Sequence, residues 1–409
     1  MGRVKAFIEE HGFYPMDEIY VCSGCFEDYG LRKYIIGHAE YDECSYCGKR
    51  AKEKIAIHID ELLIYFLECI SEEWGDPASE GVGWESREGG WVSAKVIDSY
   101  DLIMDELDLG IRHEKLAKDI IGALADKEWC QKNPHSLLMD DDLKFSWKRF
   151  SHQIKHEIRF VFYKANTYDE YAHDSEIIKE PHEIMERLGI FARELNLLGK
   201  IPQNTTIYRA RPSTKGERFI DVTELGPPLA HEAKYSNRMS PAGIAMFYGA
   251  LEEDTAIAET IDPDKDDLTI ISLASFSALD DLKILDLTNI PSTPSLFDEE
   301  MRGQKMMLSF LNAFLTDFTK PVKKNNRENI EYIPTQVITE YFKYIFWNDD
   351  QAPIQGILYP SSRRINGKAC VLFIEQRNCV GGDSNSLYRD KQWLLLDKAK
   401  TKYIEINSQ

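Results

Sequence analysis

The 409-residue sequence predicts an α+β protein of two domains, a zinc-stapled, mainly helical N-terminal domain followed by a mixed α+β domain. Three observations lead to this fold class. The chain is longer than the size at which a single hydrophobic core stops growing. Two Cys-x2-Cys pairs lie near the N-terminus. Apolar residues repeat at helical spacing up to about residue 199 and form short β-rich runs after it.

Composition and charge exclude several classes of function. The formal net charge of −20 repels nucleic-acid backbones unless a local basic surface compensates. No apolar run approaches the roughly 20 residues of a membrane-spanning helix. The N-terminal segment MGRVKAFIEEHGF lacks the apolar core of a secretory signal, and neither a GxGxxG nor a P-loop motif is present. We therefore expect a cytoplasmic protein without a membrane or nucleic-acid partner.

Four of the eight cysteines are organised as two close pairs, Cys22-x2-Cys25 and Cys44-x2-Cys47. This spacing supplies the four thiolates that a tetrahedral Zn²⁺ ion requires. Because no coordination position would remain for a substrate, the predicted metal site is structural. The alternative is a set of free or redox-active thiols, and the doubled motif argues against it.

Helical periodicity organises the rest of the N-terminal half. Residues 55–70 form an amphipathic pattern, and the segments from His113 and from Ser146 are expected to be further helices. We predict an N-terminal domain over 1–165 that includes the zinc module at 15–55. A connecting helical segment over 166–198 and a C-terminal domain over 199–409 follow.

The C-terminal domain contains four candidate site residues that are ambiguous when each is taken alone. The strand period of two places Arg209 and Arg211 on one face of TTIYRARPS, where they either pair with internal carboxylates or bind a pyrophosphate. Glu259 lies late on a helix, where a glutamate is usually solvated. Ser361 follows a strand, where a serine commonly belongs to a turn.

Four motifs in order resemble the signature of the RES family. They are YRAR at 208–211, S-x2-G-x3-FYGA at 240–250, DTAIAE at 254–259 and GILYPS at 356–361. The family is named for an arginine, a glutamate and a serine, which match Arg209, Glu259 and Ser361. Tyr248 matches the aromatic residue before the family's glutamate helix. The resemblance covers roughly residues 200–380.

The resemblance implies a fold similar to ADP-ribosyltransferases, with NAD held as a substrate in the cleft of a split β core. It implies that Arg209 holds the pyrophosphate or a ribose, with help from Arg211. Glu259 would stabilise the ribosyl cation that forms when the glycosidic bond breaks. Tyr248 would stack on nicotinamide, and Ser361 would bind its amide or a ribose. The implied function is NAD degradation by hydrolysis or phosphorolysis in a bacterial toxin or defence effector.

The chain departs from shorter members of the family in two places. Where relatives often carry a Gly-Gly-Arg-Trp run, this sequence has SNRM at 236–239, so Arg238 is a further candidate for NAD binding. The first 165 residues resemble a HEPN-type N-terminal domain, through VCSGCFEDYGLRKYI, ECSYCG and FSHQIKHEIRF. An antitoxin or regulatory protein and a second copy of the chain are the partners that the resemblance suggests.

Three alternatives stay open. The same site could transfer ADP-ribose to a macromolecule. An RNA-binding or RNA-cleaving HEPN protein would need a closely spaced arginine and histidine, with four to six residues between them. The nearest candidates are Arg149 with His152 or His156, which we interpret as residues of a packed helix. A non-catalytic scaffold would pair Arg209 with Glu259 and predicts that neither residue faces an open cleft.

Overall fold

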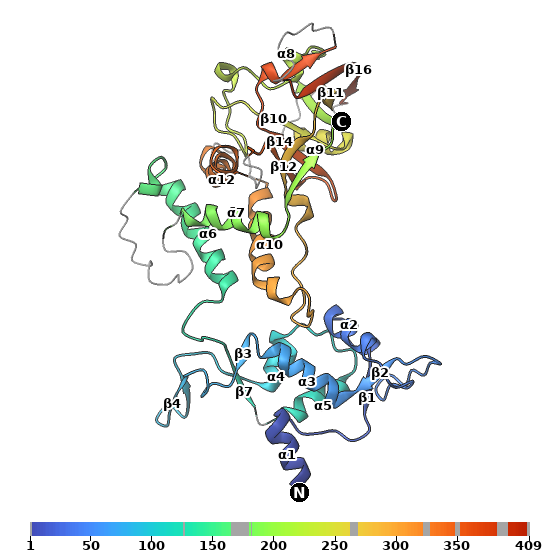
Figure 1. The fold of residues 1–409 in the computed structure, drawn as a ribbon. Coiled ribbons are helices and arrows are strands. Elements are labelled where there is room, and N and C mark those ends of the chain that lie inside the picture. Colours follow the sequence, from blue (N-terminus) through green and yellow to red (C-terminus); the bar gives the residue numbers. More distant parts are fainter. Residues whose placement is uncertain are drawn as a thin grey trace. The chain divides into compact units, whose positions relative to one another are not determined.

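The computed structural model describes residues 2–125, 127–164, 180, 182–261, 269–321, 328–347, 352–382 and 392–406. The chain divides into two compact units. Unit 1 consists of Met1–Asp141 and Ser292–Ser309, and unit 2 consists of Asp142–Pro291 and Phe310–Gln409. Figure 1 follows the chain from α1 to the C-terminal strand β16. Within the described residues, no helix is both long and apolar enough to cross a bilayer.

Unit 1 is mainly helical, as its apolar periodicity predicts. Its helices are α1 (Gly2–His11), α2 (Tyr29–Gly37), α3 (Ile59–Ile70), α4 (Ser99–Asp101) and α5 (Glu114–Ala123). Its short strands are β1 (Tyr20–Cys22), β2 (Ala56–His58), β3 (Trp74–Gly75), β4 (Gly83–Glu85), β5 (Gly90–Val92), β6 (Ile97–Asp98) and β7 (Glu128–Gln131). The predicted apolar stripe of α3 is buried in the core of the unit, through Leu62, Leu63, Phe66 and Ile70.

Segment 292–309 is part of the core of unit 1, although the chain on both sides of it belongs to unit 2. Phe297 is 3% exposed, and its ring stacks on Phe66 with 5.0 Å between the ring centroids. The Tyr65 hydroxyl donates a hydrogen bond of 2.8 Å to the Phe297 carbonyl oxygen. A Cβ atom on Gly30 would lie 2.5 Å from the Phe297 carbonyl carbon, so α2 approaches this segment at a position that only glycine fits.

Charged groups fix the C-terminal end of the same segment. Lys305 donates to both carboxylate oxygens of Glu73 at 2.7 Å. Arg302 pairs with Glu72 at 2.9 Å and donates to the Cys69 sulfur, also at 2.9 Å. Segment 292–309 therefore has both apolar and ionic contacts within unit 1.

Unit 2 is built on a nine-stranded sheet of order β15-β16-β11-β9-β10-β14-β13-β12-β8. Only the pairs β12–β13 and β15–β16 are parallel. The strands are β8 (Leu198–Ile201), β9 (Thr206–Ser213), β10 (Phe247–Ala250), β11 (Ile270–Ala278), β12 (Leu282–Asp286), β13 (Gly356–Pro360), β14 (Lys368–Leu372), β15 (Cys379–Gly381) and β16 (Leu394–Glu405). This mixed α+β architecture confirms the predicted fold class.

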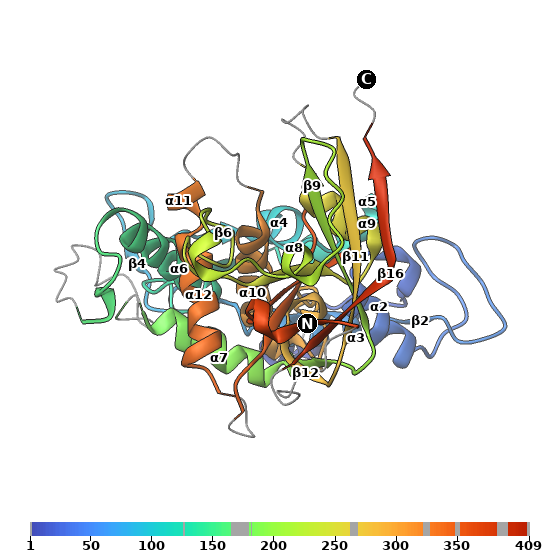
Figure 2. The ribbon, with the colours of Figure 1, turned by 90° about the horizontal axis from the view of Figure 1, so that it is seen from above.

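The helices that lie wholly or mostly in unit 2 are α6 (Met139–His156), α7 (Glu183–Glu194), α9 (Glu253–Thr260), α10 (Lys305–Thr319) and α12 (Ile333–Tyr344), with two short helices, α8 (Val222–Leu225) and α11 (Glu328–Glu331). Helix α6 packs on α10, where the Trp147 ring lies 5.0 Å from the Phe314 ring centroid. In Figure 2, α7, α10 and α12 lie together on one side of strands β9, β11 and β16. Helix α9 contacts β9, β10, β11 and β14.

The sheet opens between its central strands β9 and β10. Strand β9 pairs with β11 along its whole length, from Thr206 to Ser213. It pairs with β10 at one position only, Tyr208 opposite Ala250. Because the two strands diverge after this pair, the backbone leaves a notch beside the start of β10.

Candidate active site and metal centre

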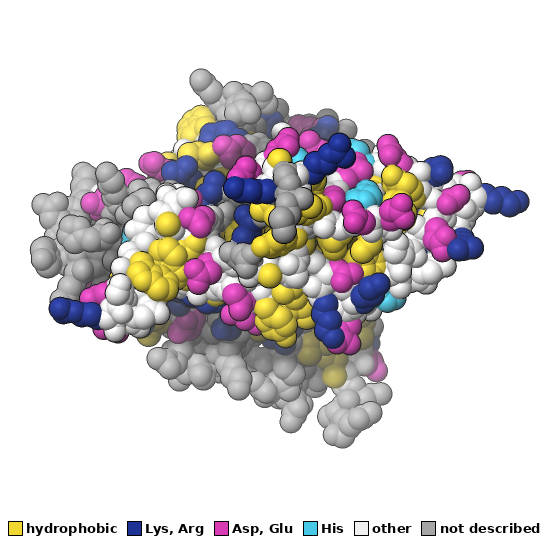
Figure 3. Space-filling view, turned by 90° about the horizontal axis from the view of Figure 1, so that it is seen from below, with side chains coloured by type: hydrophobic (Ala, Val, Ile, Leu, Met, Phe, Trp, Pro, Cys, Tyr) yellow, Lys and Arg dark blue, Asp and Glu magenta, His cyan; other side chains and the backbone are white. Residues whose placement is uncertain are grey.

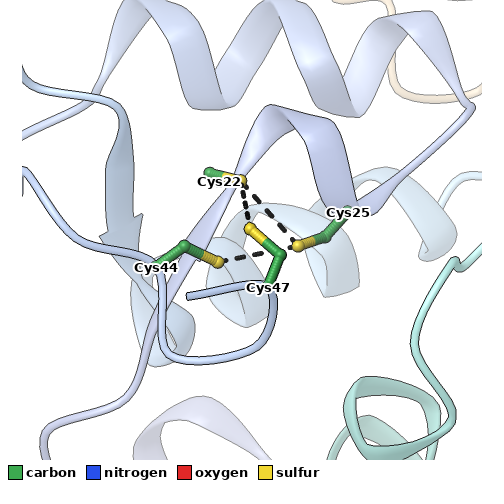
Figure 4. Close-up of side chains that lie close together, drawn as sticks. All are labelled: Cys22, Cys25, Cys44 and Cys47. Atoms are coloured by element: carbon green, nitrogen blue, oxygen red, sulfur yellow. Dashed lines mark hydrogen bonds between the residues drawn. The ribbon is translucent and has the colours of Figure 1, made fainter. Parts of the chain in front are cut away.

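The four predicted cysteine ligands come together in unit 1 (Figure 4). Cys22 ends β1, Cys25 ends the 3-10 turn Ser23–Cys25, and Cys44 and Cys47 lie on a second turn. The Sγ atom of Cys22 lies 3.8 Å from that of Cys25 and 3.5 Å from that of Cys47. The Sγ atoms of Cys25 and Cys44 are 3.6 Å apart. A tetrahedron with Zn–S bonds of about 2.3 Å has sulfur atoms about 3.8 Å apart. The cluster therefore has the dimensions of a tetrathiolate metal site.

The surroundings of this cluster suit a structural ion. Cys22, Cys25 and Cys44 are buried, and Cys47 is exposed. Burial raises the pKa of Cys22 to about 11, so a cation is needed to hold this thiol as a thiolate at neutral pH. Gly48 closes the second turn with φ of 68°, and its amide donates to the Cys44 carbonyl oxygen at 3.0 Å. All four ligands come from the protein, so the site leaves no position for a substrate.

Unit 2 contains a cavity of about 350 Å³ beside the notch between β9 and β10. Arg209 from β9, Tyr248 from β10 and Glu259 from α9 line it together. Tyr359 from β13 and residues of the chain between 228 and 246 complete the wall. Three candidate residues from a stretch that spans 50 positions, from Arg209 to Glu259, thus share one space.

Arg209 presents a cation to this cavity. Its Nη1 donates to the Tyr248 carbonyl oxygen at 2.9 Å, across the notch, and its guanidinium lies 5.1 Å from the centroid of the Phe247 ring. Its buried Nε has no hydrogen-bond partner in the described part of the chain. Burial lowers the pKa of Arg209 to about 10, which still leaves the side chain charged at neutral pH.

The scaffold alternative requires a pair between Arg209 and Glu259, and the geometry differs from that expectation. Both side chains line the cavity, and among the described residues no ion pair joins Arg209 to a carboxylate. Glu259 is exposed. The cavity therefore holds a cation and an anion that do not neutralise each other.

Ser361 holds the carboxylate of Glu259. Its hydroxyl donates to Glu259 Oε1 at 2.5 Å and accepts from the amides of Arg363 at 3.1 Å and Arg364 at 3.2 Å. A serine hydroxyl has one donor and two acceptor sites, so these three bonds use all of them. Ser361 does not line the cavity in its own right and reaches it through Glu259.

Tyr248 is fixed by its hydroxyl. The oxygen accepts from the Met239 amide at 3.3 Å and lies 2.9 Å from the Ser240 hydroxyl. Burial raises the pKa of Tyr248 to about 12, so the phenol is neutral at physiological pH. The ring of Tyr248 thus forms a rigid wall of the cavity.

The two other predicted arginines lie outside the cavity wall. Arg211 is exposed, with its guanidinium 4.6 Å from the Phe219 ring centroid, and it donates to the Glu224 carbonyl oxygen. Arg238 donates to the carbonyl oxygens of Phe318 at 3.0 Å and Lys320 at 2.6 Å. In this structure Arg238 therefore attaches the 235–240 loop to the end of α10.

Sequence reasoning did not single out Tyr359, Lys234 or Tyr235, which also line the cavity. Tyr359 lies within the GILYPS motif, two residues before Ser361, so the motif itself contained a signal for it. Lys234 and Tyr235 precede the SNRM run on a loop without regular periodicity. Their position in the wall depends on the tertiary fold, and no local pattern indicated it.

Arg149 and His156 lie on α6 with six residues between them, which is within the spacing expected of a HEPN ribonuclease. Seven positions amount to about two helical turns, so both residues point to similar sides of the helix. The spacing therefore does not argue against the ribonuclease alternative.

Figure 3 views the molecule from the side of α1, and on its coloured surface Lys and Arg are interspersed with Asp and Glu. That face offers no continuous basic surface among the coloured residues.

Comparison with family models identifies both halves of the chain. Residues 37–168 match the HEPN/RES N-terminal domain 1 model, and residues 206–396 match the RES domain model. Comparison with curated proteins finds no match, and comparison with solved structures finds none. The second match includes every residue that we place at the cavity. The chain is therefore a RES domain protein with a HEPN/RES-type N-terminal domain.

Proposed function

We propose that this protein cleaves the nicotinamide–ribose bond of NAD by hydrolysis or phosphorolysis, and that it acts as a bacterial toxin or defence effector. A RES domain is consistent with an enzyme that acts on NAD. The observation that supports the reaction is the cavity in which Arg209 and Glu259 face the same space without pairing. Cleavage of NAD uses both charges: a cation binds the pyrophosphate, and an anion stabilises the positive charge that develops on the ribose as nicotinamide leaves.

Arg209 and Glu259 have different roles in this proposal: Arg209 binds the substrate, and Glu259 promotes cleavage. Arg209 is held by the Tyr248 carbonyl oxygen, and its guanidinium lines the cavity, where it would bind oxygen atoms of the pyrophosphate. Cleavage breaks the bond between the ribose C1′ and the ring nitrogen, whose electron pair leaves with neutral nicotinamide. The ribose then carries a positive charge in the transition state. Glu259 stabilises that charge more strongly than it stabilises the ground state, which is the requirement for catalysis.

The acceptor completes the reaction. In hydrolysis, the oxygen of water bonds to C1′ and its proton passes to solvent, which yields ADP-ribose. In phosphorolysis, an anionic oxygen of inorganic phosphate bonds to C1′, which yields the phosphate ester of ADP-ribose. The hydroxyl of Ser361 restrains the Glu259 carboxylate at 2.5 Å, so the negative charge is in position before the substrate arrives. The aromatic ring of Tyr248 provides a flat surface for nicotinamide.

The proposal includes further components. Zn²⁺ is the ion that best fits the four cysteines of unit 1, where it would be structural. An antitoxin or other regulatory protein and a second copy of the chain are proposed partners, and the cytoplasm is the proposed compartment. Transfer of ADP-ribose to a macromolecule would use the same cavity with a different acceptor.

The decisive experiment follows NAD loss and nicotinamide release by the purified full-length protein, with and without phosphate. Wild type should consume NAD, and Glu259→Ala should lower the rate by about 100-fold or more. Glu253→Ala is the matched control, because Glu253 lies on the same helix and pairs with Lys402 at 2.6 Å. Dependence on phosphate would identify phosphorolysis.

Two outcomes would redirect the proposal. Intact NAD together with labelling of a macromolecule by ADP-ribose would favour the transferase. Intact NAD together with RNA cleavage that His156→Ala abolishes would favour the HEPN ribonuclease.

A further inference from the structure

Tyr359 is a cavity residue to which neither the sequence motifs nor the proposed mechanism gives a role. It lies on β13 opposite Ala369 of β14. Leu358 packs into the core on one face of the sheet, so the alternation of the strand directs Tyr359 to the opposite face, where the cavity lies. Tyr359 is only 7% exposed, and the surface that it retains belongs to the cavity wall.

The hydroxyl groups around Tyr359 are already in use. Ser361 makes three hydrogen bonds, to Glu259 and to two backbone amides. The Tyr248 hydroxyl interacts with Ser240 and with the amide of Met239. Within the described ranges, the Tyr359 hydroxyl has no hydrogen-bond partner, and it does not count among the fully buried polar atoms that lack one. Tyr235 also lines the cavity but is 82% exposed, so among the buried side chains of the wall the Tyr359 hydroxyl is the one that remains available to a ligand.

Burial and the charges near Tyr359 keep its hydroxyl protonated. Burial raises the pKa of Tyr359 well above its ordinary value, and the negative charge of Glu259 raises it further. Tyr248 and Cys370 act in the same direction, whereas Arg238 acts against it. The Tyr359 phenol and the Glu259 carboxylate thus line one cavity as a hydrogen-bond donor and a hydrogen-bond acceptor.

The Tyr359 hydroxyl and the Glu259 carboxylate suit different parts of the substrate near the bond that is cleaved. Glu259 accepts hydrogen bonds from ribose hydroxyls, which are donors. The carbonyl oxygen of the nicotinamide carboxamide is an acceptor and requires a donor. Ser361 has no free donor in this structure. We propose, on the basis of the proposed function, that the Tyr359 hydroxyl donates the hydrogen bond that holds the carboxamide oxygen of nicotinamide.

The test measures binding of free nicotinamide and of ADP-ribose to full-length wild type and Tyr359→Phe by calorimetry. The substitution keeps the ring in the wall and removes only the donor. Nicotinamide should bind about tenfold more weakly to the variant, whereas the affinity for ADP-ribose should change less than about twofold. In kinetic assays the inhibition by nicotinamide should weaken by the same factor.

Tyr341→Phe is the matched control, because Tyr341 is a buried tyrosine of unit 2, 8% exposed, that does not line the cavity. It should leave both affinities unchanged. Equal affinity of wild type and Tyr359→Phe for nicotinamide would overturn the inference, as would a loss confined to ADP-ribose. If nicotinamide binds in the expected way but NAD stays intact, the proposed function fails while the role of Tyr359 stands.

Discussion

The two units hold their candidate sites in different ways. The cysteine cluster of unit 1 takes its four ligands from 26 consecutive positions, 22–47, on two turns. The cavity of unit 2 combines Arg209, Tyr248, Glu259 and Tyr359 from three strands and a helix. In the first site the local chain sets the geometry. In the second, the divergence of β9 from β10 sets it.

This difference determines what a single substitution does. We expect loss of one thiolate to open the proposed zinc site and to change the stability of unit 1. We expect loss of one cavity side chain to remove a contact with the proposed ligand from a sheet that stays folded, and to change binding or rate. The comparison is correct only if stability and activity can be changed separately in the two units.

The largest expected effect is the loss of the metal. Cys44→Ser, or treatment of wild type with a strong chelator, should unfold unit 1, because structural zinc contributes about 10 kcal/mol or more to small zinc modules. Hydrogen exchange should become fast in residues 2–125 and 292–309 together, since both ranges belong to unit 1. Zinc release is measured with a colorimetric chelator.

Cys130→Ser is the control for this prediction, because Cys130 is buried in unit 1 outside the cluster. It should keep one zinc ion per chain. The comparison would fail if the zinc-free protein retained slow exchange in α3.

A smaller effect is expected for a substitution of Arg209, which lines the cavity. Arg209→Lys keeps the charge but loses the planar fork that reaches both the Tyr248 carbonyl oxygen and a ligand. The KM for NAD should rise by about 10- to 100-fold, with a smaller change in kcat. Arg211→Lys on the same strand should leave KM unchanged, because Arg211 lies outside the cavity wall. Equal effects of the two substitutions would show that the cavity does not bind the pyrophosphate through Arg209.

The contact between α2 and segment 292–309 allows the stability of unit 1 to be changed while the four cysteines stay intact. Gly30→Ala places a methyl group 2.5 Å from the Phe297 carbonyl carbon and should destabilise unit 1 by about 1–3 kcal/mol in denaturant titrations. Gly37→Ala on the same helix meets no atom within 4 Å and should be neutral or stabilising by up to about 1 kcal/mol. A stable Gly30→Ala protein would mean that α2 and this segment separate easily.

The sequence was sufficient to predict features whose pattern lies within one short stretch of the chain. The Cys-x2-Cys spacing predicted the cluster, and the apolar repeat predicted α3. The RES motifs predicted Arg209, Tyr248 and Glu259, and the structure brings these three residues to one cavity. Arg211 follows the same strand alternation as Arg209, but only the side chain beside the notch reaches the cavity, and the notch depends on strand pairing.

Long-range contacts account for what the sequence did not indicate. Segment 292–309 has no pattern that separates it from the RES domain, and its place in unit 1 comes from Phe297 on Phe66, more than 200 positions earlier. The role of Ser361 likewise became apparent only when its bond to Glu259 was known.

Ser361→Ala should have the smallest effect and distinguishes a positioning residue from a ligand-binding one. Without the hydroxyl, the Glu259 carboxylate loses the hydrogen bond that restrains it, so kcat for NAD should fall by about tenfold. The affinity for nicotinamide should not change, because the three hydrogen bonds of Ser361 leave it no donor for the ligand. Ser362→Ala, at the neighbouring position, is the control and should match wild type. If Ser361→Ala instead weakened nicotinamide binding while kcat held, Ser361 would contact the amide directly, and the division of roles between Ser361 and Tyr359 would have to be reversed.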